Sequence, residues 1–317
     1  MLQVSEFNTL YSKDVRKAFD DGTKDAIRNS SMNKIFQIED TGEYTEYFTT
    51  MEGNNLPTYI NEWEALPTVD FGKGYRSVFS SKEFGHKIAV TYQARLKTKD
   101  SDEMLLKYVN NLKNKAIVAL YTFLEKETHK MLNDAFAGAS LVAPDLNPIC
   151  YATHTWNSTW TTFSNVMASS ALDISVVDEA VRVWGAFVDS NGNPMPLDFK
   201  TIIAKKGGKA HTLAKKIFGF TADKQFRPTT IGAIDIYEGE YTIIATPYLT
   251  SNTAYFFLAD WAALGIENPL FVNFIERPTL QTDFTSPDNL NWTASYAGSF
   301  KFGCRDMPFV ILWSPGA

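Results

Sequence analysis

The sequence predicts an α+β fold, in which helices and strands follow one another in irregular order. Two long segments, residues 86–97 and 290–304, alternate apolar and polar side chains, which is typical of strands with one buried face. Across residues 102–136, apolar side chains instead recur every three or four positions, which is typical of a long helix. Because shorter segments of both kinds are mixed in the remaining chain, α+β fits better than a doubly wound parallel sheet.

The composition of the 317-residue chain indicates a globular protein. Hydrophobic residues make up 44% and charged residues 21%, which suffices for one large or two small cores. A net charge of −6 argues against a protein that wraps nucleic acid, because wrapping requires a cationic surface. The start of the chain does not have the pattern of a secretory signal, and no later segment approaches the ~18 apolar residues of a membrane span. We therefore expect synthesis in the cytosol and no membrane partner.

The first element is predicted to be an amphipathic helix. Apolar side chains in residues 4–18 recur every three or four positions, and the Asp21-Gly22 pair is expected to end the helix. We interpret this segment as an arm with one apolar face.

Residues 35–95 predict an extended hairpin with irregular edges, because aromatics and threonines are interrupted there by proline and glycine. The alternating segment 86–97 forms its returning limb. The preceding half contains many aromatics with no predicted partner in their own segment, which indicates a surface that another molecule completes. These aromatics are Tyr44, Tyr47, Phe48, Tyr59, Trp63, Phe71, Tyr75 and Phe79.

The helix predicted across residues 102–136 is long enough to serve as a spine of roughly 50 Å. Ser101 or Asp102 can cap its start, and Gly138 follows where it should end. A polar loop, residues 144–172, comes next. The predicted buried stripe of the helix consists of Leu105, Val109, Leu112, Ala116, Leu120, Phe123 or Leu124, Met131 and Ala135.

The second half of the chain predicts two shorter helices and several strands. Ser175 and Asp178 are expected to cap a helix over residues 176–188, and a buried strand over 198–205 leads into a helix over 208–218. Further strands are predicted at 240–249, 254–260, 270–278 and 308–313. The alternating segment 290–304 is about twice the usual strand length. We interpret it as a ribbon that reaches toward other copies of the chain.

The order of these segments resembles the major capsid proteins of tailed bacteriophages, and most of all the phage Mu-like major head subunit family. The resemblance covers about residues 35–315. One departure is the segment CYATHTWN around His154, which lacks the Asp-Gly and Leu-Phe signature of Mu-like subunits. The resemblance is carried by the spacing of LPTYINEW, KEFGHKIAVTYQARLKTKDSDEM, LDFKTIIAKKGGKAHTLAKKIF, TIIATPYL, AYFFLAD and RPTLQTDF.

This resemblance implies a major capsid protein that self-assembles into hexamers and pentamers and forms an icosahedral shell around packaged double-stranded DNA. It implies a portal and a separate scaffold or protease as partners, and a location in the virion, with assembly in the host cytoplasm. The implied parts are an N-terminal arm (1–34), an extended loop (35–98), the spine helix of a peripheral domain (99–140), an axial domain (141–270), and the strands and C-terminal return of the peripheral domain (271–317).

No residue is predicted to be catalytic, to bind a cofactor or to ligate a metal. His86, His129, His154 and His211 do not occur in a metal-ligand spacing such as HExxH, and solvated or capping roles are expected for His129 and His211. Cys150 lies four residues from His154, but the partners of a catalytic dyad normally come from distant segments.

Three further sequence features carry weak signals. Both cysteines, Cys150 and Cys304, are expected to be buried and reduced. Gly207-Gly208-Lys209 lacks the spacing of a phosphate loop and is interpreted as a strand-to-helix turn. Some related shells carry an inter-subunit Lys–Asn bond, but Lys73, Lys82 and Lys87 of the extended loop show no mark of one.

The alternative hypothesis is a monomeric α+β carbohydrate-binding protein or hydrolase. It is motivated by seven Trp and fourteen Tyr residues together with the polar loop 144–172, since aromatic side chains can stack on sugars. A pocket lined by Trp156 and Trp160 with converging carboxylates would favour it.

Overall fold

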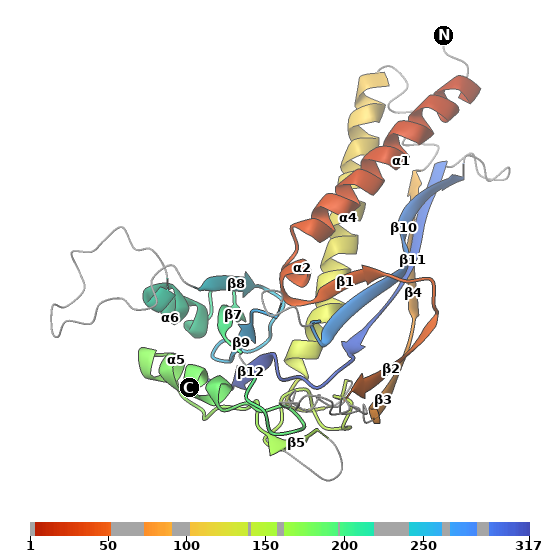
Figure 1. The fold of residues 1–317 in the computed structure, drawn as a ribbon. Helices are drawn as coiled ribbons and strands as arrows, with labels where there is room; N and C mark the ends of the chain where they lie inside the picture. Colours follow the sequence, from red (N-terminus) through yellow and green to blue (C-terminus); the bar gives the residue numbers. More distant parts are fainter. Residues whose placement is uncertain are drawn as a thin grey trace, which may run out of the picture.

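The computed structural model contains two four-stranded sheets (Figure 1). Helices pack against both sheets, and one hydrophobic core connects them. The structure describes residues 4–51, 73–90, 102–138, 141–156, 162–195, 197–218, 241–261, 267–283 and 292–317. None of the described helices has an apolar stretch long enough to cross a membrane.

The first sheet is tall and has the strand order β1-β10-β11-β4. Strand β1 runs parallel to β10, whereas β11 is antiparallel to both β10 and β4. The register between β10 and β11 shifts on either side of Glu276, next to Pro278, which has no N–H to donate to a partner strand. The strands are β1 (Gln37–Asp40), β4 (Lys82–Val90), β10 (Leu270–Asp283) and β11 (Trp292–Cys304).

The position of β11 corrects one interpretation of the sequence. The long alternating segment does form a strand, but β11 lies between β10 and β4, so both of its edges are hydrogen-bonded within this chain. It therefore does not reach toward other copies by a free edge. Its length matches that of β10, which extends five residues past the predicted end at Pro278. These two long strands form the centre of the first sheet, and two helices pack along it.

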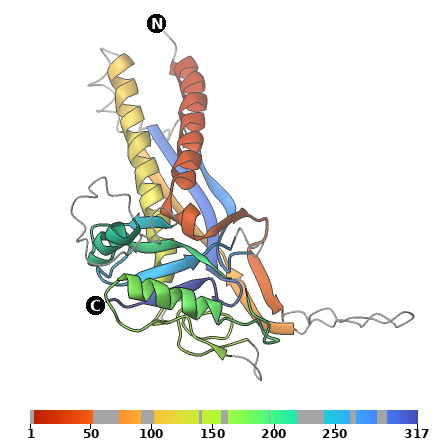
Figure 2. The same cartoon turned by 60° about the vertical axis from the view of Figure 1, so that its left-hand side comes forward.

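Helices α1 (Val4–Arg28) and α4 (Asp102–Asn133) run along the first sheet (Figures 1 and 2). Phe19 of α1 packs on Tyr296 of β11 with ring centroids 5.5 Å apart. The predicted end of α1 at Asp21-Gly22 is wrong, since the helix continues to Arg28. Gly22 instead permits close packing of the two helices, because a Cβ atom there would lie 2.8 Å from Cδ1 of Ile117 on α4.

The second sheet has the order β12-β9-β7-β8, and the helices α5 (Ile174–Gly185) and α6 (Lys209–Phe218) pack against it. Strand β7 and helix α6 confirm the predicted strand-helix unit. The predicted capping pair Ser175 and Asp178 is wrong, because the helix begins earlier, where the Asp173 carboxylate accepts a hydrogen bond from Ile174 N at 2.7 Å. The strands are β7 (Phe199–Lys205), β8 (Thr242–Thr246), β9 (Tyr255–Ala259) and β12 (Ile311–Ser314).

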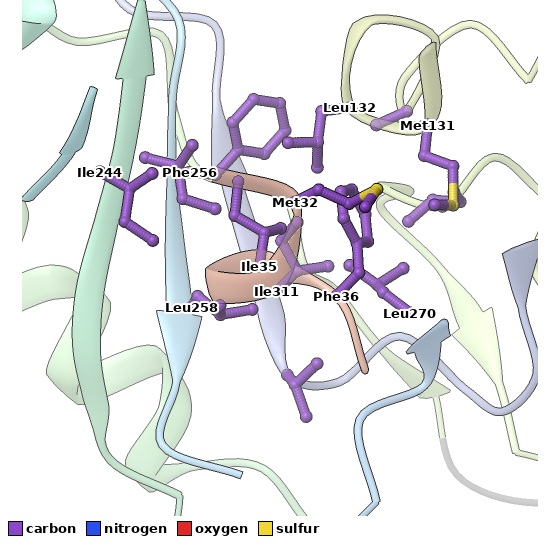
Figure 3. Close-up of a cluster of buried hydrophobic side chains, with 14 of the residues drawn as sticks. Met32, Ile35, Phe36, Met131, Leu132, Ile244, Phe256, Leu258, Leu270 and Ile311 are labelled. Carbon is purple, nitrogen blue, oxygen red and sulfur yellow. The ribbon is translucent and has the colours of Figure 1, made fainter. Parts of the chain in front are cut away.

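The short helix α2 (Ser31–Ile35) lies where the two sheets and α4 meet (Figure 3). Ser30 caps its start by accepting a hydrogen bond from Asn33 N at 2.9 Å. Its buried side chains face α4 on one side and strands of both sheets on the other, so the region just after the N-terminal helix is part of the core. The cluster in Figure 3 includes Met32, Ile35, Phe36, Met131, Leu132, Ile244, Phe256, Leu258, Leu270 and Ile311.

The predicted apolar stripe of α4 is buried in the C-terminal half of the helix. Ala116, Leu120, Leu124 and Met131 are all buried, whereas Leu112 is only half-buried. The helix ends at Asn133, three residues before the predicted end, and Gly138, with a φ of +62° that favours glycine, closes the turn that follows it.

Replacing Leu120 with Ala is expected to lower the free energy of unfolding by about 2–5 kcal/mol, because a large-to-small change in a packed core leaves a cavity. Leu120 is 2% exposed, whereas Val118 on the same helix is 63% exposed. Val118→Ala is the matched control and should change the free energy of unfolding by no more than about 0.5 kcal/mol. Urea denaturation followed by circular dichroism measures both. Equal destabilisation by the two substitutions would contradict the placement of the stripe in the core.

Candidate interaction surfaces

A two-stranded hairpin of β2 (Thr45–Met51) and β3 (Lys73–Ser80) lies at the end of the first sheet far from the N-terminus (Figure 1). Its strands are antiparallel, with Thr45 opposite Ser80 and Met51 opposite Lys73. Of the aromatics predicted to be exposed in this region, Tyr59, Trp63 and Phe71 lie outside the described residues.

One face of the hairpin packs on the first sheet. Phe79 and Phe48 contact Phe271 of β10, with ring centroids 4.9 and 5.2 Å apart. Phe79 also lies over Gly303 of β11, where an added Cβ would come within 2.2 Å of its ring. The expectation that Phe48 and Phe79 lack a partner is therefore wrong. Alternation places them on the inner face of the hairpin, which the sheet covers. Tyr75 is half-buried, and its hydroxyl lies 2.8 Å from Thr155 Oγ1.

The other face of the hairpin is exposed and apolar. Tyr47 and Val78 on this face have exposed fractions of 59% and 55%, and Tyr44, which precedes β2 and lies beside Phe84 of the first sheet, is 61% exposed. Tyr47 and Val78 are directly opposite each other in the register, and the Arg76 guanidinium lies 4.5 Å from the centre of the Tyr47 ring. The expectation that Tyr44 and Tyr47 are exposed is confirmed. We call Tyr47 and Val78 the hairpin surface. Neighbouring exposed aromatic and aliphatic side chains are typical of protein–protein contacts.

A polar cluster around the buried side chains of Lys301 and Asn273 fixes the hairpin to the sheet. The Nζ atom of Lys301 on β11 donates a hydrogen bond to the Glu43 carbonyl oxygen at 2.5 Å and lies 3.2 Å from Oε2 of Glu46. The Glu46 carboxylate also accepts hydrogen bonds from Asn273 Nδ2 at 2.9 Å and from Thr41 Oγ1 at 2.5 Å. Burial favours a higher pKa for Glu46, but the hydrogen bonds from Thr41, Asn273 and Lys301 outweigh it and lower the pKa. Glu46 is therefore ionised at neutral pH.

A second buried cluster joins α2 to α4. The Glu125 carboxylate accepts hydrogen bonds from Ser31 N at 2.8 Å and Ser31 Oγ at 2.7 Å. Nδ1 of His129 lies 2.7 Å from the Glu125 carbonyl oxygen and 3.2 Å from its carboxylate. The solvated or capping role expected for His129 is wrong, because the side chain is fully buried. Ser31 Oγ also lies 3.4 Å from Nε2 of His129, farther than from the Glu125 carboxylate, and the three residues together tie α2 to α4.

Acidification is expected to destabilise the subunit through His129. Burial disfavours the charged imidazole and lowers the pKa of His129, although Glu125 acts in the opposite direction. An unfolded histidine takes up a proton below about pH 6.5, so the unfolded state binds more protons there and the free energy of unfolding falls as the pH decreases towards the lower folded pKa. Urea denaturation at several pH values measures this slope. His129→Gln should flatten it, and the exposed His86→Gln should not. An identical slope in both variants would contradict the assignment.

His154 pairs with a carboxylate and not with Cys150. Its Nδ1 lies 2.8 Å from Asp145 Oδ2, and both side chains are buried. Cys150 is also fully buried, which raises the pKa of its thiol and keeps it protonated. The Cys150–His154 proximity in the sequence is therefore not a nucleophile–base pair in the fold. Cys150 and Cys304 are both free and buried, as expected.

The turn at Gly207 is structural. Nδ1 of His211 accepts a hydrogen bond from Gly207 N at 3.1 Å, and Gly207 has a φ of +78°. Burial and the charges of Lys215 and Lys206 lower the pKa of His211, which favours the neutral ring that can accept this bond. His211 has the expected capping role, and the predicted strand-to-helix turn is confirmed.

The described part of the chain contains no group of three or more His, Cys, Asp or Glu side chains that could hold a metal ion. Trp156 packs against Phe163 and Phe309, with ring centroids 5.3 and 5.6 Å apart. It is half-buried and packs against the core. Trp160 lies outside the described residues.

No protein-family model matches the sequence, and no curated protein matches it. Its fold, however, is similar to several solved structures. A structure of Mycobacterium phage Patience has a TM-score of 0.52 at 12% identity, covering 100% of this chain and 89% of that one. The virus-like particle from Pyrococcus furiosus gives a TM-score of 0.50 at 13% identity, with coverages of 95% and 98%. The capsid of a native GTA particle gives 0.51 at 11% identity, with coverages of 90% and 89%. The predicted α+β fold of tailed-phage major capsid proteins is thereby confirmed.

Proposed function

We propose that this chain is the major subunit of an icosahedral shell, assembling into hexamers and pentamers that enclose double-stranded DNA. The observation that carries the proposal is the likeness in fold, over nearly the whole chain, to a virus-like particle and to the capsid of a GTA particle. The exposed hairpin surface supports it, because such a surface is stabilised when another subunit covers it. The net charge of −6 is compatible with a shell that encloses DNA without binding it tightly.

In this proposal the parts of the fold take the roles that the sequence resemblance implies. Helix α4 and the strands β10 and β11 of the first sheet belong to the peripheral domain, made of residues 99–140 and 271–317, whereas β1 and β4 of that sheet come from the extended loop. The strands β7, β8 and β9 of the second sheet, with α5 and α6, belong to the axial domain, residues 141–270, and β12 of that sheet comes from the C-terminal return. Residues 1–34 act as the arm and 35–98 as the extended loop. Within tailed-phage capsid proteins, the order of the sequence segments favours the Mu-like head subunit family.

The proposed role is interaction and not catalysis. Two buried carboxylates have structural partners: Glu125 holds α2, and Asp145 holds His154. The proposed partners are further copies of the chain, a portal, and a separate scaffold or protease. The proposed location is the virion, after assembly in the host cytoplasm.

Negative-stain electron microscopy with light scattering tests the proposal on the purified chain, alone and co-expressed with the other head proteins of its phage. Closed shells, tubes, or rings of five or six subunits are the expected result. A protein that stays monomeric under both conditions would overturn the proposal.

A further inference from the structure

Lys301 is an unusual residue for the centre of a sheet. Its side chain is only 1% exposed, and it lies on β11 beneath the β2–β3 hairpin. Moving an ammonium group out of water is costly unless close partners compensate, and here they are the Glu43 carbonyl oxygen and the Glu46 carboxylate. A lysine held in this way is shielded from solvent and from other subunits, so a chemical partner must come from its own chain.

An asparagine lies beside it. Asn273 on β10 is the direct register partner of Lys301. Residues opposite each other in an antiparallel pair place their side chains on the same face, with Cβ atoms about 4.5–5.5 Å apart. Asn273 is itself buried, and its Oδ1 atom has no hydrogen-bond partner. A buried amide oxygen without a partner is rare in folded proteins, because each such group is destabilising.

One carboxylate oxygen connects the two side chains. Oε2 of Glu46 accepts the hydrogen bond from Asn273 Nδ2 at 2.9 Å and lies 3.2 Å from Lys301 Nζ. An amine, a carboxamide and an ionised carboxylate are therefore held together. The carboxylate contacts the two nitrogen atoms between which a proton would have to move if the amine displaced the amide nitrogen.

The surroundings of the cluster restrict water. Phe271 lies two residues before Asn273, and Gly303 two residues after Lys301, so both share the face on which the cluster lies. Phe48 and Phe79 cover this face, and Phe79 fills the space above Gly303. Reactants that are fixed side by side react much faster than free reactants, since no further loss of freedom is needed.

We infer that Lys301 and Asn273 condense into an intramolecular isopeptide bond, with Glu46 as the group that transfers the protons. Glu46 accepts a proton from the Lys301 ammonium, and the free Nζ attacks Cγ of Asn273. As the Nζ–Cγ bond forms and the Cγ–Nδ2 bond breaks, Glu46 gives its proton to Nδ2 and takes the second proton from Nζ. Ammonia leaves, Glu46 ends protonated, and neither an oxidant nor a further reactant is needed.

The bond would link β10 and β11 covalently at the end of the first sheet where the hairpin is attached (Figure 1). These are the two longest strands of the structure's described part. A covalent link between them would prevent the pair from separating at this end when the subunit is pulled. It joins parts of one chain and leaves separate subunits unlinked. The inference does not depend on the proposed shell function.

Intact-protein mass spectrometry of the purified full chain tests the inference. The expected mass is lower than the sequence mass by one ammonia molecule, and a tryptic digest should contain a branched peptide that joins Lys301 to Asn273. Lys301→Arg and Glu46→Gln should restore the full sequence mass of each variant. Lys87→Arg, which changes an exposed lysine on the neighbouring strand β4, should leave the loss of ammonia unchanged.

A wild-type chain that is folded by circular dichroism and has its full sequence mass would overturn the inference, whether or not the variants fold. Loss of ammonia that persists in Lys301→Arg would also overturn it, because the loss would then arise elsewhere. Denaturing gels separate the intramolecular bond from a bond between subunits. The inferred bond gives a single band at the mass of one chain, whereas bands at multiples of that mass would contradict it.

Discussion

Particle formation is expected to fail in Tyr47→Glu and in Val78→Glu, tested separately, while each variant subunit stays folded. The two side chains are 59% and 55% exposed and face each other across the hairpin surface. In the free subunit a glutamate at either position remains in water, so the free energy of unfolding should change by no more than about 0.5–1 kcal/mol. In a shell, the same carboxylate would be buried without a partner at every copy of the contact.

The size of the effect follows from repetition. Burying an unpaired charge at a contact costs several kcal/mol, and a loss of about 1.4 kcal/mol already weakens a contact tenfold. Because a shell contains many copies of each contact, particle yield should fall by roughly tenfold or more. Sedimentation and electron microscopy measure the yield, and thermal melting measures the subunit. Tyr47→Phe and Val78→Thr preserve size at each position and should still assemble. Normal particle yield in both glutamate variants would contradict the assignment of the hairpin surface to a contact between subunits.

The elements of the fold could be predicted where the signal is local. The buried stripe of α4 and the alternation in β11 are periodic patterns within one segment, and both elements form where those patterns lie. Pairing is different, because it depends on residues far apart in the sequence. Strand β1 pairs with β10, which follows it by more than two hundred residues, and no local pattern in the chain identifies that partner. The role of β11 as an interior strand was missed for the same reason.

The same limit applies to the candidate sites. Alternation in β2 and β3 predicts two faces but does not indicate which face the sheet covers, so Phe79 and Tyr47 could not be told apart. Glu46, Asn273 and Lys301 come from three separate strands, and each looks ordinary in its own segment. His129 was assigned to solvent because its helix is polar nearby, whereas α2 packs over that turn and buries it.

Glu125→Ala is expected to lower the free energy of unfolding by about 1–3 kcal/mol for each buried donor that loses its acceptor, because such a donor can no longer exchange its bond to water for one in the fold. The backbone N–H and the hydroxyl of Ser31 would both lose their acceptor. Glu127→Ala on the same helix is the matched control. Glu127 pairs with Lys130, whose side chain is 53% exposed, and surface pairs of this kind contribute about 0–1 kcal/mol.

The location of α2 makes a further outcome measurable. Its side chains lie between α4 and both sheets (Figure 3), so weakening the Glu125 cluster should loosen this junction before the sheets themselves separate. Hydrogen exchange of the amides in α2 should therefore accelerate in Glu125→Ala more than exchange in β7 or β11. Urea denaturation gives the total loss of stability, and the exchange pattern shows where it arises. If Glu125→Ala and Glu127→Ala were equally stable, the cluster would contribute nothing to holding the N-terminal region on the spine helix. If exchange instead accelerated uniformly, α2 would unfold only together with the whole subunit.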